Sequence, residues 1–299
     1  MVCDILPLNA FIAGWRIFRM GLVLTIANNK GGVGKTLVTL SVASTITWLQ
    51  KNDPTKLPQH MRKAPILVVD TDPQANTTEA LGIDPVEVAV NILELYENPS
   101  VIETTSGLSL LQASPKHKNI VVIPSSIKLE SISNTLPSQI DGRTRLKDAI
   151  DRVRDNYSLI IIDTPPSLGI FTQNAVVAAD NILIPLTLTK HALLGVSNML
   201  TFLVTAKKSQ NPRLNVLGLL VNAYDKRYRL QTSLLKAIQK EYDSFSFDTI
   251  IPTSSRMVEN IAARRNLLHN IPADHRGILI DLLNELFHRV DTPVEFHKG

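Results

Sequence analysis

The chain has 299 residues, of which 44% are hydrophobic and 19% charged, and its formal net charge is +4. These values indicate a soluble globular protein with enough length for a sizeable core, and no run reaches the roughly 18 apolar residues of a membrane span. The single cysteine, Cys3, excludes a disulfide framework and a cysteine-held iron–sulfur cluster within one chain, and it suits a reducing cytosol.

The first 19 residues form a segment that differs from the rest. They are apolar in patches, carry Arg16 and Arg19, and lack the basic start and cleavage site of a signal peptide. Because Met20 directly precedes the first predicted strand, we interpret residues 1–19 as an extension that the core does not need. A small interfacial or partner-binding helix is the alternative. Residues 20–299 are then expected to form a single domain.

Short apolar runs alternate with longer segments of helical periodicity along the rest of the chain. Strands are predicted at 21–28, 65–70, 119–126, 157–163, 181–187, 214–222 and 247–251. Helices are predicted near 36–50, 143–156, 191–208, 230–241, 255–268 and 273–290, with another after the prolines that follow residue 163. This alternation predicts an α/β fold, a mostly parallel central β-sheet with helices on both faces.

The segment NNKGGVGKTL, residues 28–37, lies between the first strand and the first helix. Its glycines let backbone N–H groups turn inward around phosphate oxygens at a helix N-terminus. Lys35 is expected to reach the β- and γ-phosphates, and the Thr36 hydroxyl to ligate Mg²⁺. The alternative, a tight strand–helix connection, does not require Lys-Thr in this order. The expected nucleotide cradle comprises Gly31, Gly32, Val33, Gly34, Lys35, Thr36 and Leu37.

Three aspartates follow later strands and supply the carboxylates that such a site needs. Asp163 ends the run LIIID, at the strand edge where ligands bind in open α/β sheets, and it is expected to hold Mg²⁺ through water. Asp70 and Asp72 follow the second strand in VVDTDPQ, and alternation places both on the same side. At least one of these two is expected to face the terminal phosphate.

The motifs KGGVGKT, DTDPQANTT and IIIDTPPSLG, in this order, resemble the ParA/MinD family of deviant Walker-A P-loop ATPases, and most closely its ParA branch. The resemblance covers about residues 20 to 290 and implies ATP and Mg²⁺ as cofactors. It also implies that Lys30, the lysine before the glycines, reaches phosphates held by the other subunit of a nucleotide-sandwich homodimer. Asp72 corresponds to the residue that orients the attacking water, and it is also a candidate metal ligand.

Further positions follow from the same resemblance. Asn222 resembles the residue that reads adenine, and Pro252 resembles the wall of the adenine pocket. A strand-end cap and a loop proline are the simpler interpretations of these two residues. The sequence departs from the family at Leu37, where a second threonine is usual, so a hydroxyl expected near the α-phosphate is missing.

Positive charge is concentrated in the C-terminal part of the chain. Residues 207–265 contain eleven Lys/Arg and five Asp/Glu, a local net charge of +6, and the isoelectric point is near 9.1. Lys226, Arg227 and Arg229 lie in this region, and the resemblance makes Arg256, Arg264 and Arg265 candidates for DNA binding, because they lie in the part that faces DNA in the family. An ordinary solvated face is the alternative. Sequence-independent contact with DNA is expected, because Lys/Arg contacts to phosphates carry no base information.

These observations favour a cytoplasmic, nucleoid-associated partition or positioning ATPase. The resemblance implies an ATP-dependent homodimer that binds DNA non-specifically until a ParB-like or cargo-bound adaptor protein stimulates slow hydrolysis. A MinD-like membrane ATPase is the alternative, but the amphipathic segment 278–290 carries Asp281 and Glu285, which anionic lipid would repel. A cluster carrier would need cysteines that the core lacks, and a non-enzymatic structural protein would not need Lys30 together with Asp72.

Overall fold

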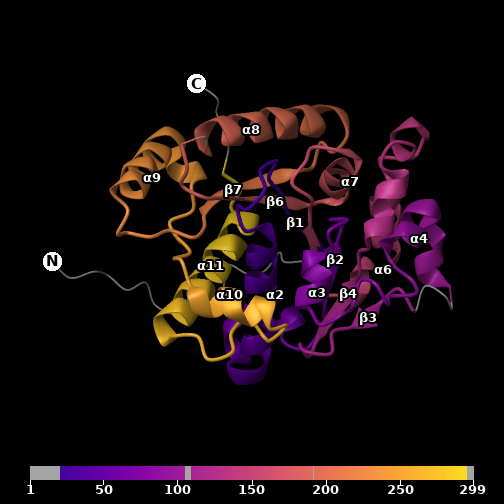
Figure 1. Cartoon of the computed structure of the whole chain (residues 1–299), viewed down its shortest axis with the longest axis horizontal. Coiled ribbons are helices and arrows are strands. Elements are labelled where there is room, and N and C mark those ends of the chain that lie inside the picture. Colours follow the sequence, from indigo (N-terminus) through magenta and orange to yellow (C-terminus); the bar gives the residue numbers. More distant parts are fainter. Residues whose placement is uncertain (1–20, 105–108, 191, 295–299) are drawn as a thin grey trace.

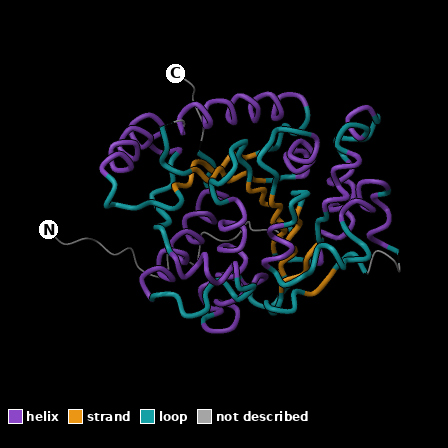
Figure 2. Tube along the Cα trace, viewed as in Figure 1, coloured by secondary structure: helices purple, strands orange, loops and turns teal. Residues whose placement is uncertain are grey.

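A computed structural model describes residues 21–104, 109–190 and 192–294 of the protein. The interpretation of residues 1–19 as a dispensable extension, and Cys3 with it, lies outside the described residues. Figure 1 shows a central sheet with helices on either side of it, and Figure 2 shows the same arrangement by secondary structure.

The described residues form a seven-stranded sheet in the order β3-β4-β2-β5-β1-β6-β7. Only the pairing of β3 with β4 is antiparallel. The predicted fold, a mostly parallel α/β sheet, is therefore confirmed. The strands are β1 (Leu22–Ile26), β2 (Ile66–Asp70), β3 (Gln112–Ala113), β4 (Ile120–Ile123), β5 (Leu159–Asp163), β6 (Asn181–Leu186) and β7 (Asn215–Val221).

The strand register brings the carboxyl ends of β1, β2 and β5 to the same edge of the sheet. Ile26, the last residue of β1, lies beside Asp163 of β5, and Asp163 also lies beside Asp70 of β2. The glycine loop leaves β1 at this same edge. The chain positions its phosphate loop and two of its carboxylates together because all three strands run in the same direction.

Helices cover both faces of the sheet. The helix α2 (Lys35–Asn52) packs with α10 (Ser255–Ala262) and α11 (Ala273–Asp291) against one face, where Val68 and Ile161 point. The opposite face, with Leu67 and Ile160, is covered by α4 (Ile92–Glu97), α6 (Arg145–Val153) and α7 (Ile170–Ala178). The remaining α-helices of the described residues are α3 (Asn76–Ala80), α8 (Ala192–Ser209) over β6 and β7, and α9 (Arg229–Tyr242).

Burial on both faces explains the continuous apolar runs of the sequence. Every residue of β2 and β5 is buried, and burying one Leu or Ile side chain stabilises a fold by about 1.5 to 3 kcal/mol. A strand with one solvated face would instead alternate polar and apolar residues.

The prediction of a strand at 247–251 is wrong. This segment runs beside β7, and its backbone bonds to it at both ends, Phe247 N to Leu219 O at 2.8 Å and Ile251 N to Val221 O at 2.9 Å. Between these points the N–H groups of Asp248 and Thr249 donate to the Glu285 carboxylate of α11. The Glu285 side chain of α11 therefore takes the N–H group of Thr249, which a continuous ladder with β7 would have used.

The predicted helix 255–268 ends early, at Ala262. Arg264 has a left-handed backbone with φ of 52°, and Arg265 N turns back to donate to Asn260 O at 2.8 Å. The Asn260 side chain also donates to the carbonyls of Leu267 and His269. Asn260 thus closes the helix and holds the loop that follows it.

The apolar side of the amphipathic segment 278–290 is used inside the protein. Within α11, Leu279, Leu282, Leu283, Leu286 and Phe287 are buried in the core shared with α2. Among the helices of the described ranges, none combines the length and apolar character that crossing a membrane requires.

Candidate functional site

The glycine loop has the backbone shape that its glycines predict. Gly32 and Gly34 have φ of 72° and 88°, a left-handed region that favours glycine. At Gly34 a side chain is also excluded by space, because a Cβ there would overlap the Nδ2 atom of Asn222. Gly31 and Gly32 are exposed, so the outer side of the loop is open to solvent.

Lys35 begins α2 and is buried beneath the loop. Its Nζ donates to the carbonyl of Asn28 at 3.2 Å and to that of Lys30 at 3.1 Å. Burial lowers the pKa of Lys35, whereas the negative charges of Asp163 and Asp72 raise it. The lysine therefore holds the loop in place and lies close to two carboxylates.

Thr36, Asp163 and Thr77 form a hydrogen-bonded group at the end of β5. The Oδ2 atom of Asp163 accepts from Thr36 Oγ1 at 2.8 Å and from Thr77 Oγ1 at 2.5 Å. Its other oxygen, Oδ1, is buried and has no hydrogen-bond partner among the described residues. Burial raises the pKa of Asp163 to about 6, and the two threonine hydroxyls act in the opposite direction.

The two aspartates of DTDPQ have different roles. Asp70 is fully buried, and its Oδ2 accepts from Thr78 N at 2.8 Å and Thr78 Oγ1 at 2.7 Å. Burial and the neighbouring Asp163 raise its pKa to about 7. Asp72 is half-buried, faces the cleft described next, and accepts from Gln74 N at 3.0 Å. Of the pair that the sequence left open, Asp72 is the one that lines the site, and Asp70 holds the start of α3.

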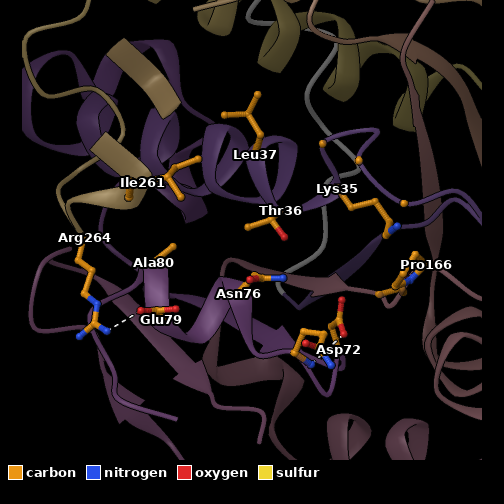
Figure 3. Close-up of a pocket in the computed structure, with 16 residues that line it drawn as sticks. Lys35, Thr36, Leu37, Asp72, Asn76, Glu79, Ala80, Pro166, Ile261 and Arg264 are labelled. Atoms are coloured by element: carbon orange, nitrogen blue, oxygen red, sulfur yellow. Dashed lines mark hydrogen bonds and ion pairs between the residues drawn. The ribbon is translucent and has the colours of Figure 1, made fainter. Parts of the chain in front are cut away.

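A cleft of about 530 Å³ opens beside the loop. In Figure 3, Lys35, Asp72 and Pro166 lie toward one end of it, and an ion pair between Arg264 and Glu79 lies toward the other. Leu37 and Ile261 point toward each other on the side of α2 and α10. The lining is completed by Gly31, Gly32, Gly34, Thr36, Gln74, Asn76, Ala80, Thr164 and Ala262.

The two residues expected at adenine lie on neighbouring segments, outside this cleft. Asn222 follows β7, and its Nδ2 donates to the carbonyl of Val33 in the glycine loop at 2.9 Å. Its Oδ1 is buried and unpartnered within the described ranges. Pro252 pairs with Tyr224, two residues after Asn222. The contact of Asn222 with the loop gives it a structural role whether or not it also reads a base.

Lys30 is bound within its own chain. Its Nζ donates to Thr189 Oγ1 at 2.7 Å, and its backbone N–H donates to Asn28 Oδ1 at 3.1 Å. Lys30 is half-buried, next to the exposed Gly31.

The six basic residues singled out in the sequence are placed differently from one another. Arg256 pairs with Glu259 of the same helix at 3.3 Å, whereas Arg264 reaches Glu79 at 2.5 Å and lines the cleft. Arg265 is exposed. Lys226, Arg227 and Arg229 lie at or just before the start of α9, with Arg227 paired to Asp225.

The donor groups of the site fit a magnesium–nucleotide complex. Mg²⁺ prefers oxygen ligands, keeps several waters and takes few protein ligands beside phosphates. A threonine hydroxyl at the helix start and a buried carboxylate whose Oδ1 has no partner among the described residues match that need, and the cleft beside the glycine loop leaves room for phosphates. Thr77 and Thr189 were not found from the sequence, although Thr77 follows Asp72 in the motif DTDPQANTT.

Comparison with known proteins places this geometry among nucleotide-binding relatives. The model of a family described as an AAA domain matches residues 21–216. The chain is 31% identical over 240 residues to the sporulation initiation inhibitor protein Soj of Bacillus subtilis, covering 80% of this chain and 87% of that protein.

Two solved structures are similar over most of the chain. A putative plasmid partition protein of Borrelia burgdorferi bound to AMPPNP has a TM-score of 0.68 and 25% identity, and the match covers 90% of this chain and 98% of that one. A protein of Mycobacterium smegmatis described as cobyrinic acid a,c-diamide synthase, with an ATP analogue and magnesium bound, has a TM-score of 0.67 and 27% identity. That match covers 82% of this chain and 91% of that one.

Proposed function

The chain belongs to the ParA/Soj family of P-loop ATPases, and from that premise we propose that it is a partition ATPase whose ATP-bound homodimer binds DNA non-specifically. The observation that carries the proposal is the Thr36–Asp163 contact of 2.8 Å beside the glycine loop, with Asp72 facing the same cleft. Relatives named for partition, such as Soj, support the cellular role. Those crystallised with an ATP analogue, one of them with magnesium, support ATP and Mg²⁺ as cofactors.

The residues of the site divide the chemistry among them. The glycine-loop amides and Lys35 would neutralise phosphate charge, and Thr36 and Asp163 are the residues that would hold a magnesium ion. A bound magnesium ion would withdraw negative charge from the terminal phosphate. Asp72 orients the attacking water from the open side of the cleft. Hydrolysis is slow until an adaptor protein acts.

The dimer is proposed from the position of Lys30 and the open side of the loop. Gly31 and Gly32 are exposed, so a second subunit can face the phosphates there. Lys30 lies immediately beside them and carries the charge that would reach across. Only the ATP-bound state would bring the two loops together. Dimerisation would therefore depend on whether ATP is bound.

DNA binding is proposed on the surface that contains Arg256 and Arg265. Arg265 is exposed and its guanidinium makes no ion pair with a described residue. Arg264 is tied to Glu79 and is the weaker candidate of the three. A homodimer would present two copies of this surface, which is why ATP would switch binding on.

A membrane role has less support. The apolar residues of α11 that an amphipathic anchor would need are buried in the core. On its polar side Glu285 already binds Arg289 and the backbone of 248–249. Nucleoid association in the cell is therefore the proposed location, with a ParB-like or cargo-bound adaptor as the stimulating partner.

DNA titrations test the proposal. Removing one arginine that neutralises a phosphate should reduce the slope of log affinity against log salt by about 0.9. Arg256→Glu with Arg265→Glu should flatten that slope and weaken unrelated duplexes equally in the presence of ATP. Lys63→Glu is the control. It makes the same charge change per site at an exposed position before β2, at the amino end of the strands, and DNA binding should stay as in the wild type. A wild-type protein that ignores DNA at low salt with ATP yet binds anionic vesicles would favour the membrane alternative.

A further inference from the structure

The carboxylate of Asp163 is held by two hydroxyl groups, and one of them has no assigned role. One hydroxyl belongs to Thr36, the expected metal ligand. The other belongs to Thr77 in α3, the helix that follows β2, and this residue has no assigned role. Both hydroxyls donate to the same atom, Oδ2, at 2.8 and 2.5 Å. The other oxygen, Oδ1, is buried without a partner among the described residues.

This division of the two oxygens has a chemical consequence. A hydroxyl has one proton to donate, so a Thr36 that donates to Asp163 keeps its lone pairs free for a cation. The second donation, from Thr77, fills Oδ2 and leaves Oδ1 to accept from a metal-bound water. Rotation of the carboxylate would exchange these positions, and Thr77 opposes that rotation.

Thr77 is itself held in place by its neighbour. Thr78 N and Thr78 Oγ1 both donate to the buried Asp70, at 2.8 and 2.7 Å. Thr78 Oγ1 also accepts from Ser125 N at 2.9 Å, which ties α3 to the end of β4. The backbone at residue 77 is therefore fixed relative to β5, and the Thr77 hydroxyl is fully buried.

We propose that Thr77 is a positioning residue of the magnesium site: its hydroxyl fixes the Asp163 carboxylate so that Oδ1 faces the metal-bound water and Thr36 keeps its lone pairs for the cation. This inference rests on the magnesium–nucleotide site of the proposed function. It assigns to Thr77 no contact with substrate and no proton transfer. Its effect is on how much magnesium the site requires.

The test measures the magnesium requirement of nucleotide binding, without hydrolysis. A fluorescent, non-hydrolysable ATP analogue is bound to the full chain while free Mg²⁺ is raised from zero, and fluorescence anisotropy is recorded. Thr77→Val replaces the hydroxyl by a methyl of the same shape and should raise the Mg²⁺ concentration for half-maximal binding about tenfold, the loss of one hydrogen bond to a charged group. Affinity in EDTA should stay within about twofold, because the cation-independent contacts remain.

Two variants separate positioning from stability. Thr77→Ser keeps the hydroxyl and should restore the wild-type Mg²⁺ requirement. Thr71→Val is the matched control, because Thr71 Oγ1 is also buried and donates at 2.7 Å to Asp163, but to its backbone carbonyl. It should lower the melting temperature without changing the Mg²⁺ requirement.

A Thr77→Val protein with the wild-type Mg²⁺ requirement overturns the inference, and so does an equal shift in Thr71→Val. If Thr77→Val fails to fold, Thr77→Ala removes the same hydroxyl and is measured in its place. The titration follows nucleotide binding at protein concentrations below those of dimerisation, so a failure of DNA binding or of dimerisation leaves its result unaffected.

Discussion

The Nζ atom of Lys30 donates a hydrogen bond of 2.7 Å to the Oγ1 atom of Thr189 in the same chain. Thr189 follows β6, and its backbone N–H donates to Thr187 O at 2.9 Å. The proposed role of Lys30 is at a phosphate held by a second subunit. To reach that phosphate, the Lys30 side chain must first break its hydrogen bond to Thr189. The free energy of this bond would therefore oppose dimerisation.

Removal of the Thr189 hydroxyl is expected to favour the dimer. Thr189→Val releases Lys30 from its partner in the monomer, and a typical hydrogen bond contributes about 1 kcal/mol. Each of the two subunits loses one such bond, so the protein concentration for half-maximal ATP-dependent dimerisation should fall by roughly thirtyfold. Analytical ultracentrifugation with a non-hydrolysable analogue measures it, and Thr189→Ser should behave as the wild type. An unchanged midpoint in Thr189→Val would show that the contact does not restrain the lysine.

Lys30→Ala is expected to separate nucleotide binding from dimerisation. The side chain of Lys30 bonds to Thr189 and not to the loop that carries Lys35, so the cradle should stay intact. The variant should bind ATP with near wild-type affinity and remain monomeric in light scattering. A stable ATP dimer of Lys30→Ala would show that Lys30 is an ordinary loop lysine with no part in dimerisation.

Lys35→Ala and Asp72→Ala are expected to fail at different steps. Lys35 lies under the phosphate loop, and its loss should abolish nucleotide binding in equilibrium measurements. Asp72 lines the cleft and makes no bond to the loop glycines, so Asp72→Ala should bind ATP. Its phosphate release should fall by about 10²- to 10⁴-fold if the carboxylate orients the water. Wild-type turnover by Asp72→Ala would remove that assignment.

Local sequence was sufficient to predict the strands around the site and to place Asp163 at the end of one of them, beside the glycine loop. The runs ending at residues 26 and 163 are buried strands, and their common direction puts Thr36 and Asp163 in contact. Alternation could not separate Asp70 from Asp72, because it places both on the same side. The difference comes from Thr78, which captures Asp70 through α3 and leaves Asp72 for the cleft.

Contacts between distant segments account for the wrong strand prediction and for the position of Arg264. The segment 247–251 has the composition of a strand, but Glu285 of α11 takes two of its N–H groups. Arg264 belongs to a basic region in sequence, yet it pairs with Glu79, which lies 185 residues earlier. Neither Glu285 nor Glu79 can be identified as a partner from the neighbouring sequence, because both contacts depend on how the helices pack on the sheet.

Ala75→Gly is expected to stabilise the protein. Ala75 caps α3 with φ of 54° and ψ of 30°, a left-handed conformation that costs a non-glycine residue about 1 to 2 kcal/mol. Glycine recovers that cost but loses more chain entropy on folding, so the net gain should be about 0.5 to 1 kcal/mol in the free energy of unfolding. Chemical denaturation measures it. Asn119, at φ of 62°, is the matched control, and Asn119→Gly should gain less because asparagine tolerates this region. A destabilised Ala75→Gly would contradict the expectation.

His117→Gln is expected to reduce the loss of stability in acid. His117 is buried, its Nδ1 lies 3.2 Å from Asn266 Nδ2, and burial lowers its pKa from 6.5 to about 4. Between these two values the unfolded chain binds a proton that the folded protein does not. The free energy of unfolding should therefore fall as pH drops from about 6.5 toward 4, by about 2 kcal/mol from this residue. Urea titrations at pH 7.5 and 4.5 give the difference for each protein. Glutamine does not titrate, so the variant should lose less stability between the two pH values. If His117→Gln shows the full wild-type difference, the acid sensitivity has another source.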